Sequence, residues 1–353
     1  MAVNTRIPGQ VGRLGDLIGS VRRAGQTSRF VGVLALLVVM FGFFAVTEGT
    51  FLSSGNINQL LTSMAIIFLV SIGMTFVMLS EGFDLSVGAT VAFTGIAFGQ
   101  LFDAAGLTLV PAALCAVAAG TAVGILNGVL IGRSGLSFLV VTLGTSVLIQ
   151  GVLNLWSEAK TISVTSPTLD TLAFGKLFGI PIPVWIMALV YAGSLYVLRK
   201  TYFGRDVYAV GGNADAARLS GIKVVRTIVA VYVIAAFLAA LAGILQVARV
   251  GAASPLVGAT LVFDAAAAVL LGGTSLAGGI GGVTGTMVGV LFLGVLQNGL
   301  SVSGVESYWQ QVVTGIILII VVAADRAQRE GWSSIGIPLH RRSRRTHDKE
   351  PAS

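Results

Sequence analysis

Long apolar segments recur along this chain, and they constrain its fold more than any other feature of the sequence. A helix needs roughly 20 mainly apolar residues to cross a hydrocarbon core about 30 Å thick. Ten such segments are expected at residues 31–46, 60–79, 85–101, 107–131, 136–156, 182–198, 227–248, 261–276, 283–302 and 309–324. Only 10% of the residues are charged, against about 25% in soluble domains, so a soluble globular fold is excluded. The sequence therefore predicts an all-α, polytopic membrane protein of about ten transmembrane helices, some of them broken.

The distribution of lysine and arginine predicts how the chain crosses the membrane, because cytoplasmic loops and tails hold most basic residues. With both termini in the cytoplasm, all of the 22 lysines and arginines lie inside except Lys160, Lys176 and Arg249. We therefore expect a cytoplasmic tail (1–29), a transmembrane domain (30–324) and a basic cytoplasmic tail (325–353). The net charge of +7 then reflects topology and anionic lipid headgroups, and we expect no nucleic-acid partner.

Residues for catalysis or metal binding are scarce. His340 and His347, the two histidines, lie in the basic tail, and the single cysteine, Cys115, lies in an apolar segment. They cannot build a metal cluster or a Cys/His catalytic pair. The chain also lacks the G-x-x-x-x-G-K-[ST] run that holds nucleotide phosphates. We therefore expect no enzyme activity, no metal and no cofactor, so a separate subunit must bind ATP if ATP drives the protein.

A polar insert with six lysines and arginines interrupts the apolar segments at residues 199–226. Residues 213–219 within it have a helical signal: Asn213 is a good N-cap, Asp215 suits the positive helix N-terminus, and Gly221 ends the helix. A capped helix on a basic cytoplasmic loop indicates a docking surface for a soluble partner. The alternative is an ordinary solvated loop helix.

Glycine is about twice as frequent as usual, with 46 residues. In membranes, small residues four positions apart allow helix backbones to approach closely. Gly124/Gly128, Gly281/Gly285 and Gly285/Gly289 have this spacing. We expect tight helix packing at these pairs.

Two glycine-rich clusters have a different character. The first glycine-rich cluster (residues 81–88, EGFDLSVG) and the second (residues 271–279, LGGTSLAGG) combine helix breakers with hydrogen-bonding side chains. Irregular backbone at membrane depth must be buried in protein or line a water-filled cavity. Both clusters are therefore candidates for a translocation path or its gates. Their candidate polar residues are Asp84, Ser86, Thr274 and Ser275.

Asp84 is the sharpest of these candidates, because a carboxylate near hydrocarbon costs about 2.5 to 3.5 kcal/mol on insertion scales. It either caps a helix that begins at Leu85 or takes part in substrate binding or gating. Asp264, near the start of another apolar segment, has the same alternatives.

Three segments resemble one protein family. EGFDLSVGA (81–89), FGRDVYAVGGNADAARLSGIKV (203–224) and LLGGTSLAGGIGGVTGTMVGVLFLGVLQNGL (270–300) are similar to permease subunits of bacterial ABC sugar importers of the ribose, xylose and galactose branch, a branch related to branched-chain amino-acid permeases. The resemblance implies a ten-span permease domain in the cytoplasmic (inner) membrane, in contact with membrane lipid. It also implies an ABC ATPase subunit, an extracytoplasmic solute-binding protein and a second permease subunit, in a homodimer or heterodimer, as partners.

The resemblance assigns the insert to ATPase coupling. Where such permeases have E-A-A-x-x-x-G, this chain has DAARLSG at 215–221, with Asp in place of Glu. The short helix is then a cytoplasmic coupling helix in a groove of the ATPase. The implied coupling residues are Gly212, Asn213, Asp215, Ala216, Ala217, Arg218 and Gly221.

The fifth apolar segment departs from the family pattern, because related permeases often carry a proline pair where this chain has residues 135–138. One face of that segment mixes apolar and hydrogen-bonding side chains, which suits the passage of a sugar. The path candidates from the apolar segments are Phe138, Thr142, Thr145, Gln150 and Asn298.

The expected function is a transport subunit in which ATP hydrolysis by a partner moves a monosaccharide or similar polyhydroxylated solute inward. One alternative is an ion-coupled secondary transporter, with Asp84 and Asp264 binding the ion at broken helices. Another is an ABC permease for a non-sugar solute, such as a branched-chain amino acid or an autoinducer.

Overall fold

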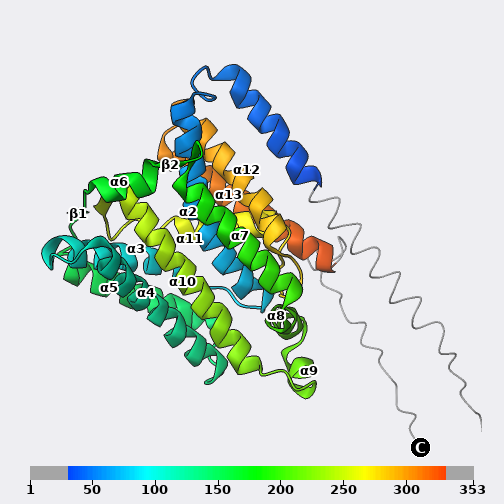
Figure 1. The fold of residues 1–353 in the computed structure, drawn as a ribbon. Helices are drawn as coiled ribbons and strands as arrows, with labels where there is room; N and C mark the ends of the chain where they lie inside the picture. Colours follow the sequence, from blue (N-terminus) through cyan, green and yellow to red (C-terminus); the bar gives the residue numbers. More distant parts are fainter. Residues whose placement is uncertain (1–30, 331–353) are drawn as a thin grey trace, which may run out of the picture.

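Long helices lie side by side in the computed structural model, which describes residues 31–330 (Figure 1). Seven of the described helices are long and apolar enough to cross a membrane. They are α2 (Ser54–Leu79), α4 (Leu109–Gly132), α5 (Phe138–Trp156), α7 (Ile182–Lys200), α10 (Val224–Val250), α12 (Val283–Val302) and α13 (Ser307–Glu330). The shorter apolar helices are Val31–Thr47, α3 (Val87–Gly99) with the π-helical turn η1 (Gln100–Ala104), and α11 (Leu261–Leu271). The prediction of a mostly helical, multi-pass membrane protein is confirmed.

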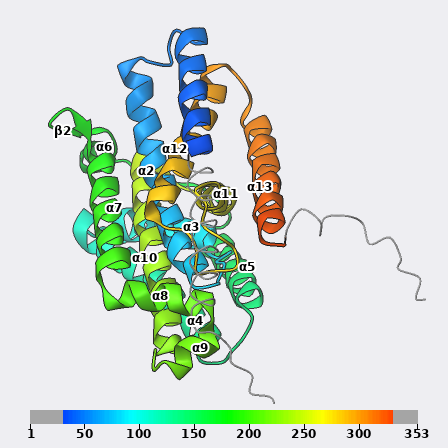
Figure 2. The same cartoon turned by 90° about the vertical axis from the view of Figure 1, so that its right-hand side faces the viewer.

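Small elements cover the two ends of the helix bundle. At one end, which we call the α6 end, lie α6 (Pro167–Phe174) and four short strands. The strands form two antiparallel pairs: β1 (Ile162–Ser163) with β4 (Ala252–Ala253), and β2 (Lys176–Leu177) with β3 (Ile180–Pro181). At the opposite end, the α9 end, lie α8 (Tyr202–Gly212) and α9 (Ala214–Leu219), as Figures 1 and 2 show from two sides.

Helix α10 is the centre of the bundle. It packs against α4, α2 and α3, and most of its central residues are buried. Its contact with α4 depends on glycine, because a Cβ on Gly124 would collide with the Tyr232 carbonyl and one on Gly128 with the Cα of Val229. The predicted packing role of this glycine pair is confirmed.

A second close contact joins α11 and α12. Gly285 lies against Gly272, and Gly289 lies against the carbonyl of Ala268, so neither α12 position has room for a Cβ. This glycine pair packs as predicted. The prediction for Gly281 is wrong, because α12 begins only at Val283 and Gly281 lies before it with a φ of 128°.

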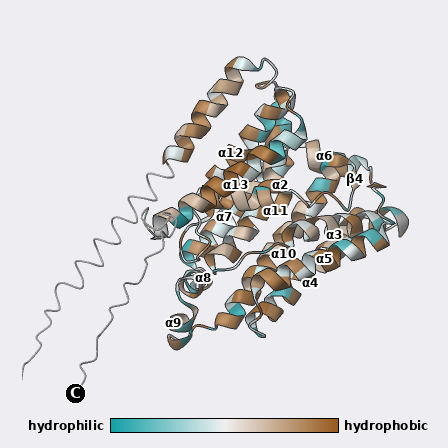
Figure 3. Ribbon diagram, turned by 180° about the vertical axis from the view of Figure 1, so that it is seen from behind, coloured by the Kyte–Doolittle hydropathy of each residue, from teal (hydrophilic) through white to brown (hydrophobic). Residues whose placement is uncertain are grey.

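The outer helices expose large apolar side chains. In α5 and α13, Val147, Leu155, Ile319 and Ile320 are each at least 60% exposed. Figure 3 shows apolar residues along these helices. Exposing such a surface to water costs free energy, whereas lipid tails or a second membrane subunit can cover it.

Two helix boundaries differ from the predicted segments in the glycine-rich clusters. α3 begins at Val87 rather than at Leu85, and α11 ends at Leu271 rather than at Leu276. α11 stops because two glycines follow it, and Gly273 has a φ of 86°, a conformation that other residues avoid. Both clusters are therefore breaks between helices, as predicted.

The C-terminal helix α13 continues to Glu330, beyond the predicted end of the last apolar segment at Ala324. The predicted N-terminal tail (1–29) and the residues from 331 onward, including His340 and His347, lie outside the described residues.

Candidate transport site and coupling surface

The short helix α9 lies at the outermost point of the end of the bundle that also holds α8. Asn213 caps it as predicted: its Oδ1 accepts a hydrogen bond from the Ala216 N–H at 2.8 Å. Gly221, with a φ of 85°, follows the end of the helix. The local cap and stop signals in the sequence therefore predict this helix correctly.

Helix α9 turns most of its surface outward. Ala217 is its buried residue, in a small apolar cluster with Val210 and Val224. Leu219, in contrast, is 90% exposed. An apolar side chain held in the open at the tip of a helix suits contact with another protein. The remaining predicted coupling residues are exposed too: Gly212, Asn213, Asp215, Ala216, Arg218 and Gly221.

Helix α8 connects α9 to both glycine-rich clusters. Gly211 of α8 lies directly on the carbonyl of Leu79, with no room for a Cβ. The same carbonyl accepts a hydrogen bond from the Gly279 N–H at 2.9 Å. Gly278 lies close to both Gly211 and Glu81. Three segments that are far apart in the sequence therefore meet here: the end of α2, the end of α8 and the end of the second glycine-rich cluster.

The second glycine-rich cluster leads into a loop that hydrogen-bonds to itself. Thr274 Oγ1 accepts from the Gly282 N–H at 3.4 Å, and Ser275 Oγ accepts from the backbone N–H two residues further on at 3.3 Å. Tyr208 of α8 donates from its Oη to the Gly281 carbonyl at 2.9 Å. Thr274 and Ser275, which are path candidates, are buried and stabilise this loop.

Asp84, in the first glycine-rich cluster, is 1% exposed. Its Oδ1 accepts hydrogen bonds from the backbone N–H and the Oγ of Ser86, at 2.8 and 2.6 Å. Since α3 begins at Val87, Asp84 closes the turn before the helix. The expected cap on a helix beginning at Leu85 is therefore wrong in its position.

The hydrogen bonds of Asp84 continue into α4 and α5. Asn127 Nδ2 donates to Ser86 Oγ at 2.8 Å, and Thr145 Oγ1 donates to Asn127 Oδ1 at 2.7 Å. We call these four residues the Asp84 network. All four are buried. The hydrogen bonds run in one direction, from Thr145 to Asn127, from Asn127 to Ser86 and from Ser86 to the Asp84 carboxylate. The network ties the turn between α2 and α3 to two neighbouring helices.

Asn127 is a functional candidate that the sequence reasoning missed. It is the one amide side chain in the apolar segment 107–131. A polar side chain in a transmembrane helix needs a partner, because lipid offers none. A single amide in an otherwise apolar segment therefore indicates a polar contact within the protein.

Three further path candidates lie on α5. Thr142 Oγ1 donates to the Phe138 carbonyl of its own helix at 2.8 Å, and the Phe138 side chain packs at the edge of the main core. Gln150 Nε2 donates to the Pro255 carbonyl at 3.1 Å, in the segment after β4. Thr142 Oγ1 also donates to the carbonyl of Phe83, directly before Asp84, at 3.4 Å.

Asn298 and Asp264 lie on α12 and α11. Asn298 and Asn56 exchange two amide hydrogen bonds of 2.9 Å, which join α12 to α2. Asp264 accepts from Gln297 Nε2 at 2.9 Å, between α11 and α12. The predicted path residues thus form several separate polar contacts within the chain rather than one continuous lining.

Comparison with known proteins gives a consistent result. A family model described as "Branched-chain amino acid transport system / permease component" matches residues 56–322. The ribose import permease protein of Escherichia coli (strain K12) is 36% identical over 300 residues, covering 84% of this chain and 93% of the relative.

Two further relatives are similar over the same extent. The ribose import permease protein of Bacillus subtilis (strain 168) is 38% identical over 299 residues, covering 84% of this chain and 91% of the relative. The D-allose transport system permease protein of Escherichia coli (strain K12) is 36% identical over 295 residues, covering 83% and 90%. No solved structure matches the chain. The family match contains both glycine-rich clusters, α8 and α9.

Proposed function

This chain belongs to the family of permease components of branched-chain amino acid transport systems and, within it, to the permeases of sugar importers; from that premise we propose its function. It is the transmembrane subunit of an ATP-binding-cassette importer that carries a monosaccharide or a similar polyhydroxylated solute across the cytoplasmic membrane. A separate subunit hydrolyses the ATP. The observation that carries this proposal is 36–38% identity, over more than four fifths of the chain, to permeases named for ribose and D-allose import.

Ten membrane crossings follow if the three shorter apolar helices cross with the seven long ones. At about 1.5 Å per residue, α11 covers only about half of the hydrocarbon core. In the irregular segment before α11, Gly258 lies directly against Gly88 of α3, so protein covers the backbone at that position. Such enclosure is what a broken transmembrane helix requires.

The α9 end faces the cytoplasm in this proposal. The insert between α7 and α10 holds six basic residues at that end, and Arg133 follows α4. Lys160, Lys176 and Arg249 lie at the α6 end. The excess of positive charge at the α9 end supports a cytoplasmic position, with both termini on the same side.

The ATPase docks on α9 and moves the permease through α8. Exposed Leu219 provides an apolar contact for a groove of the ATPase. Gly211 leaves no space between α8 and either the carbonyl of Leu79 or the backbone of Gly279, so a displacement of α8 must displace the end of α2, which leads into the first glycine-rich cluster, and the end of the second cluster. Packed backbone contacts of this kind transmit displacement because they cannot be compressed. The Asp84 network then carries the shift of the first cluster into α4 and α5.

Partners outside the cytoplasm complete the proposed importer. A solute-binding protein docks at the α6 end, and a second permease subunit, identical or related, covers part of the exposed apolar surface of the outer helices. Lipid covers the rest. The support is the resemblance to import permeases together with the large apolar side chains exposed on α5 and α13.

An ion-coupled transporter is the competing mechanism. It needs carboxylates that are available to bind an ion, whereas Asp84 and Asp264 each accept hydrogen bonds from side chains of this chain. An ABC permease for an amino acid is the competing cargo, and the family description includes such systems.

Reconstitution into liposomes separates these alternatives. The permease is assembled with its ATPase and binding protein, and uptake of radiolabelled ribose, allose and leucine is measured with and without ATP. We expect uptake of a sugar that requires all three components. Uptake by the permease alone, driven by a sodium or proton gradient, would contradict the proposal, and ATP-driven uptake of leucine alone would change the cargo.

A further inference from the structure

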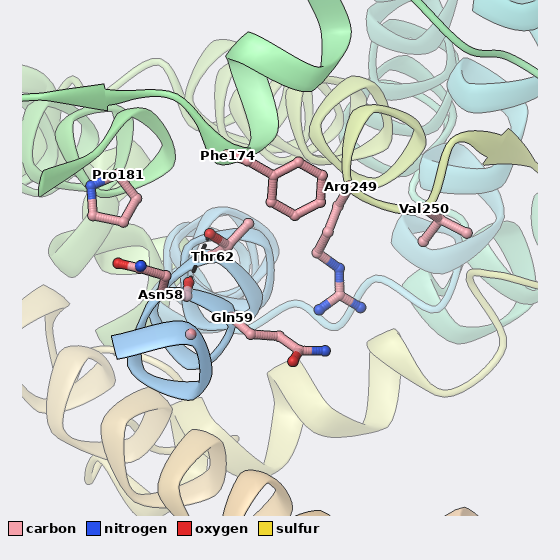
Figure 4. A pocket seen from close by; sticks show the side chains of 8 residues that line it. Asn58, Gln59, Thr62, Phe174, Pro181, Arg249 and Val250 are labelled. Carbon is pink, nitrogen blue, oxygen red and sulfur yellow. Dashed lines mark hydrogen bonds between the residues drawn. The ribbon is translucent and has the colours of Figure 1, made fainter. Parts of the chain in front are cut away.

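A cavity of about 540 Å³ lies at the α6 end, between the first turns of α2 and the last turn of α10 (Figure 4). Its size falls within the range of small-molecule sites. The lining residues are Gly55, Asn58, Gln59, Thr62, Phe174, Pro181, Arg249 and Val250. None of these residues is acidic, so the cavity has a positive charge without a lining counter-charge.

Arg249 is the unusual member of this lining. One terminal nitrogen of its guanidinium donates to Ser63 Oγ. Its Nε atom is buried and has no hydrogen-bond partner. Within residues 31–330, no carboxylate lies within ion-pair distance of Arg249. A buried N–H without a hydrogen-bond partner is rare, so this guanidinium is not fully satisfied by the protein.

Other donors point into the same space. Figure 4 shows the Gln59 side chain from α2 and the Arg249 side chain from α10 reaching towards each other. Asn58 also lines the cavity, but it lies nearer to Pro181 and its amide points away from Arg249. The Thr62 hydroxyl is already used, because it donates to the Asn58 carbonyl at 2.9 Å. The cavity therefore presents several N–H donors and a cation, the arrangement that a ligand with several acceptor oxygens needs.

We propose that this cavity binds a phosphate group, supplied either by a membrane lipid headgroup or by free inorganic phosphate. A guanidinium can bind two oxygens of a phosphate at once, and the Gln59 amide can donate to a third. Phe174, Pro181 and Val250 provide an apolar wall for the organic part of a lipid. Occupation would join α2 to α10 beside the contact between Arg249 and Ser63.

The test measures thermal unfolding of the full chain, purified in detergent and freed of lipid. One arm adds inorganic phosphate, with sodium chloride at equal ionic strength as the control. The other adds dihexanoyl phosphatidylglycerol, with dihexanoylglycerol, which lacks the phosphate, as the control. We expect a saturable rise in the melting temperature with at least one phosphate probe and no rise with its control. A response to inorganic phosphate identifies the free anion as a source, and a response to the lipid alone identifies the headgroup.

Variants connect the effect to the cavity. Arg249→Gln should abolish the rise, and Arg249→Lys should weaken the apparent dissociation constant about tenfold because a lysine cannot bind in a two-pronged manner. Gln59→Ala, at an exposed position, should weaken binding and is available if Arg249→Gln fails to fold. Lys176→Gln, a cation at the same end outside the cavity, should leave binding unchanged. No response of the wild type to either probe, or an equal response in the Arg249 and Gln59 variants, would overturn the proposal.

Discussion

Individual glycines hold the helices of this protein together. A side chain at Gly289 has no space, because the carbonyl of Ala268 occupies it, whereas Gly144 on the exposed side of α5 has no neighbour within 4 Å. The same residue type therefore has opposite roles at two positions on transmembrane helices.

This difference predicts the outcome of two alanine substitutions. Gly289→Ala should lower the free energy of unfolding by about 1 to 3 kcal/mol, the usual cost of overpacking. Gly144→Ala should leave stability unchanged or raise it slightly, because alanine favours helix. Thermal unfolding in detergent measures both, and equal melting temperatures for the two variants would contradict the packing argument.

The Asp84 network makes Asn127 a second sensitive position. Asn127→Leu keeps the branched shape of the side chain but removes its hydrogen bonds to Ser86 and Thr145, so stability should fall by about 1 to 3 kcal/mol. ATP-driven uptake should also fall, because the turn between α2 and α3 is no longer tied to α4 and α5. Asn154→Leu is the control for stability, because Asn154 is exposed on α5 and accepts one side-chain hydrogen bond, from Gln150 at 3.3 Å. Equal melting temperatures and equal uptake rates for the two variants would contradict a role of the Asp84 network in stability and transport.

For single residues, the sequence predicts which side chains need hydrogen-bond partners, but it does not predict which residues those partners are. Asp84 and Ser86 are neighbours in the chain, so their contact follows from a local turn. Asn127 finds its partners 41 and 18 residues away, and no local pattern contains that information. Gly281 has the spacing of a packing residue, yet it lies outside the helix because the chain breaks at the glycines before Val283.

Among the elements, α9 provides the sharpest test of ATPase coupling. Leu219→Glu places a charge at the exposed tip, so the amount of ATPase that copurifies should fall at least about tenfold while membrane insertion is retained. Gly221→Pro should have a similar effect, because proline cannot adopt the φ of 85° found there.

The matched control is Leu177→Glu, since Leu177 is an exposed leucine at the α6 end. It should copurify with as much ATPase as the wild type. Loss of the ATPase from this variant as well would mean that the charge acts on folding rather than on docking.

Some elements are predictable from local sequence and others are not. The signals of α9 are its own cap and its own glycine, so its bounds follow from neighbouring residues. The end of α11 was misplaced because hydropathy continues through Leu276, while the backbone stops at Gly272 and Gly273. β1 and β4 are two residues each and pair across some 90 residues, which leaves no periodic signal.

For the whole molecule, the topology gives a prediction about accessibility. In a Cys115→Ala background, a cysteine at Lys176 should react with a membrane-impermeant maleimide in intact cells. A cysteine at Ala214 should react only after the membrane is permeabilised, because the proposed orientation places α9 in the cytoplasm. The reversed pattern would rule out the proposed orientation and the coupling role of α9 with it.

The sequence predicts the mostly helical, multi-pass architecture well, because hydrophobic length is summed over many residues. The arrangement of the helices around α10 has no such summed signal. It depends on individual contacts, such as Gly211 on Leu79, that are made between distant parts of the chain.

The central position of α10 bears on how a cell must synthesise this protein. Its neighbours α2, α3 and α4 leave the ribosome well before Val224 is translated, so for a time they lie in the bilayer without the helix that fills the space between them. During that interval the insertion machinery has to keep three incomplete helices from pairing wrongly or being degraded. A nascent chain that stalls before α10 therefore exposes the faces of three helices that α10 covers in the finished permease.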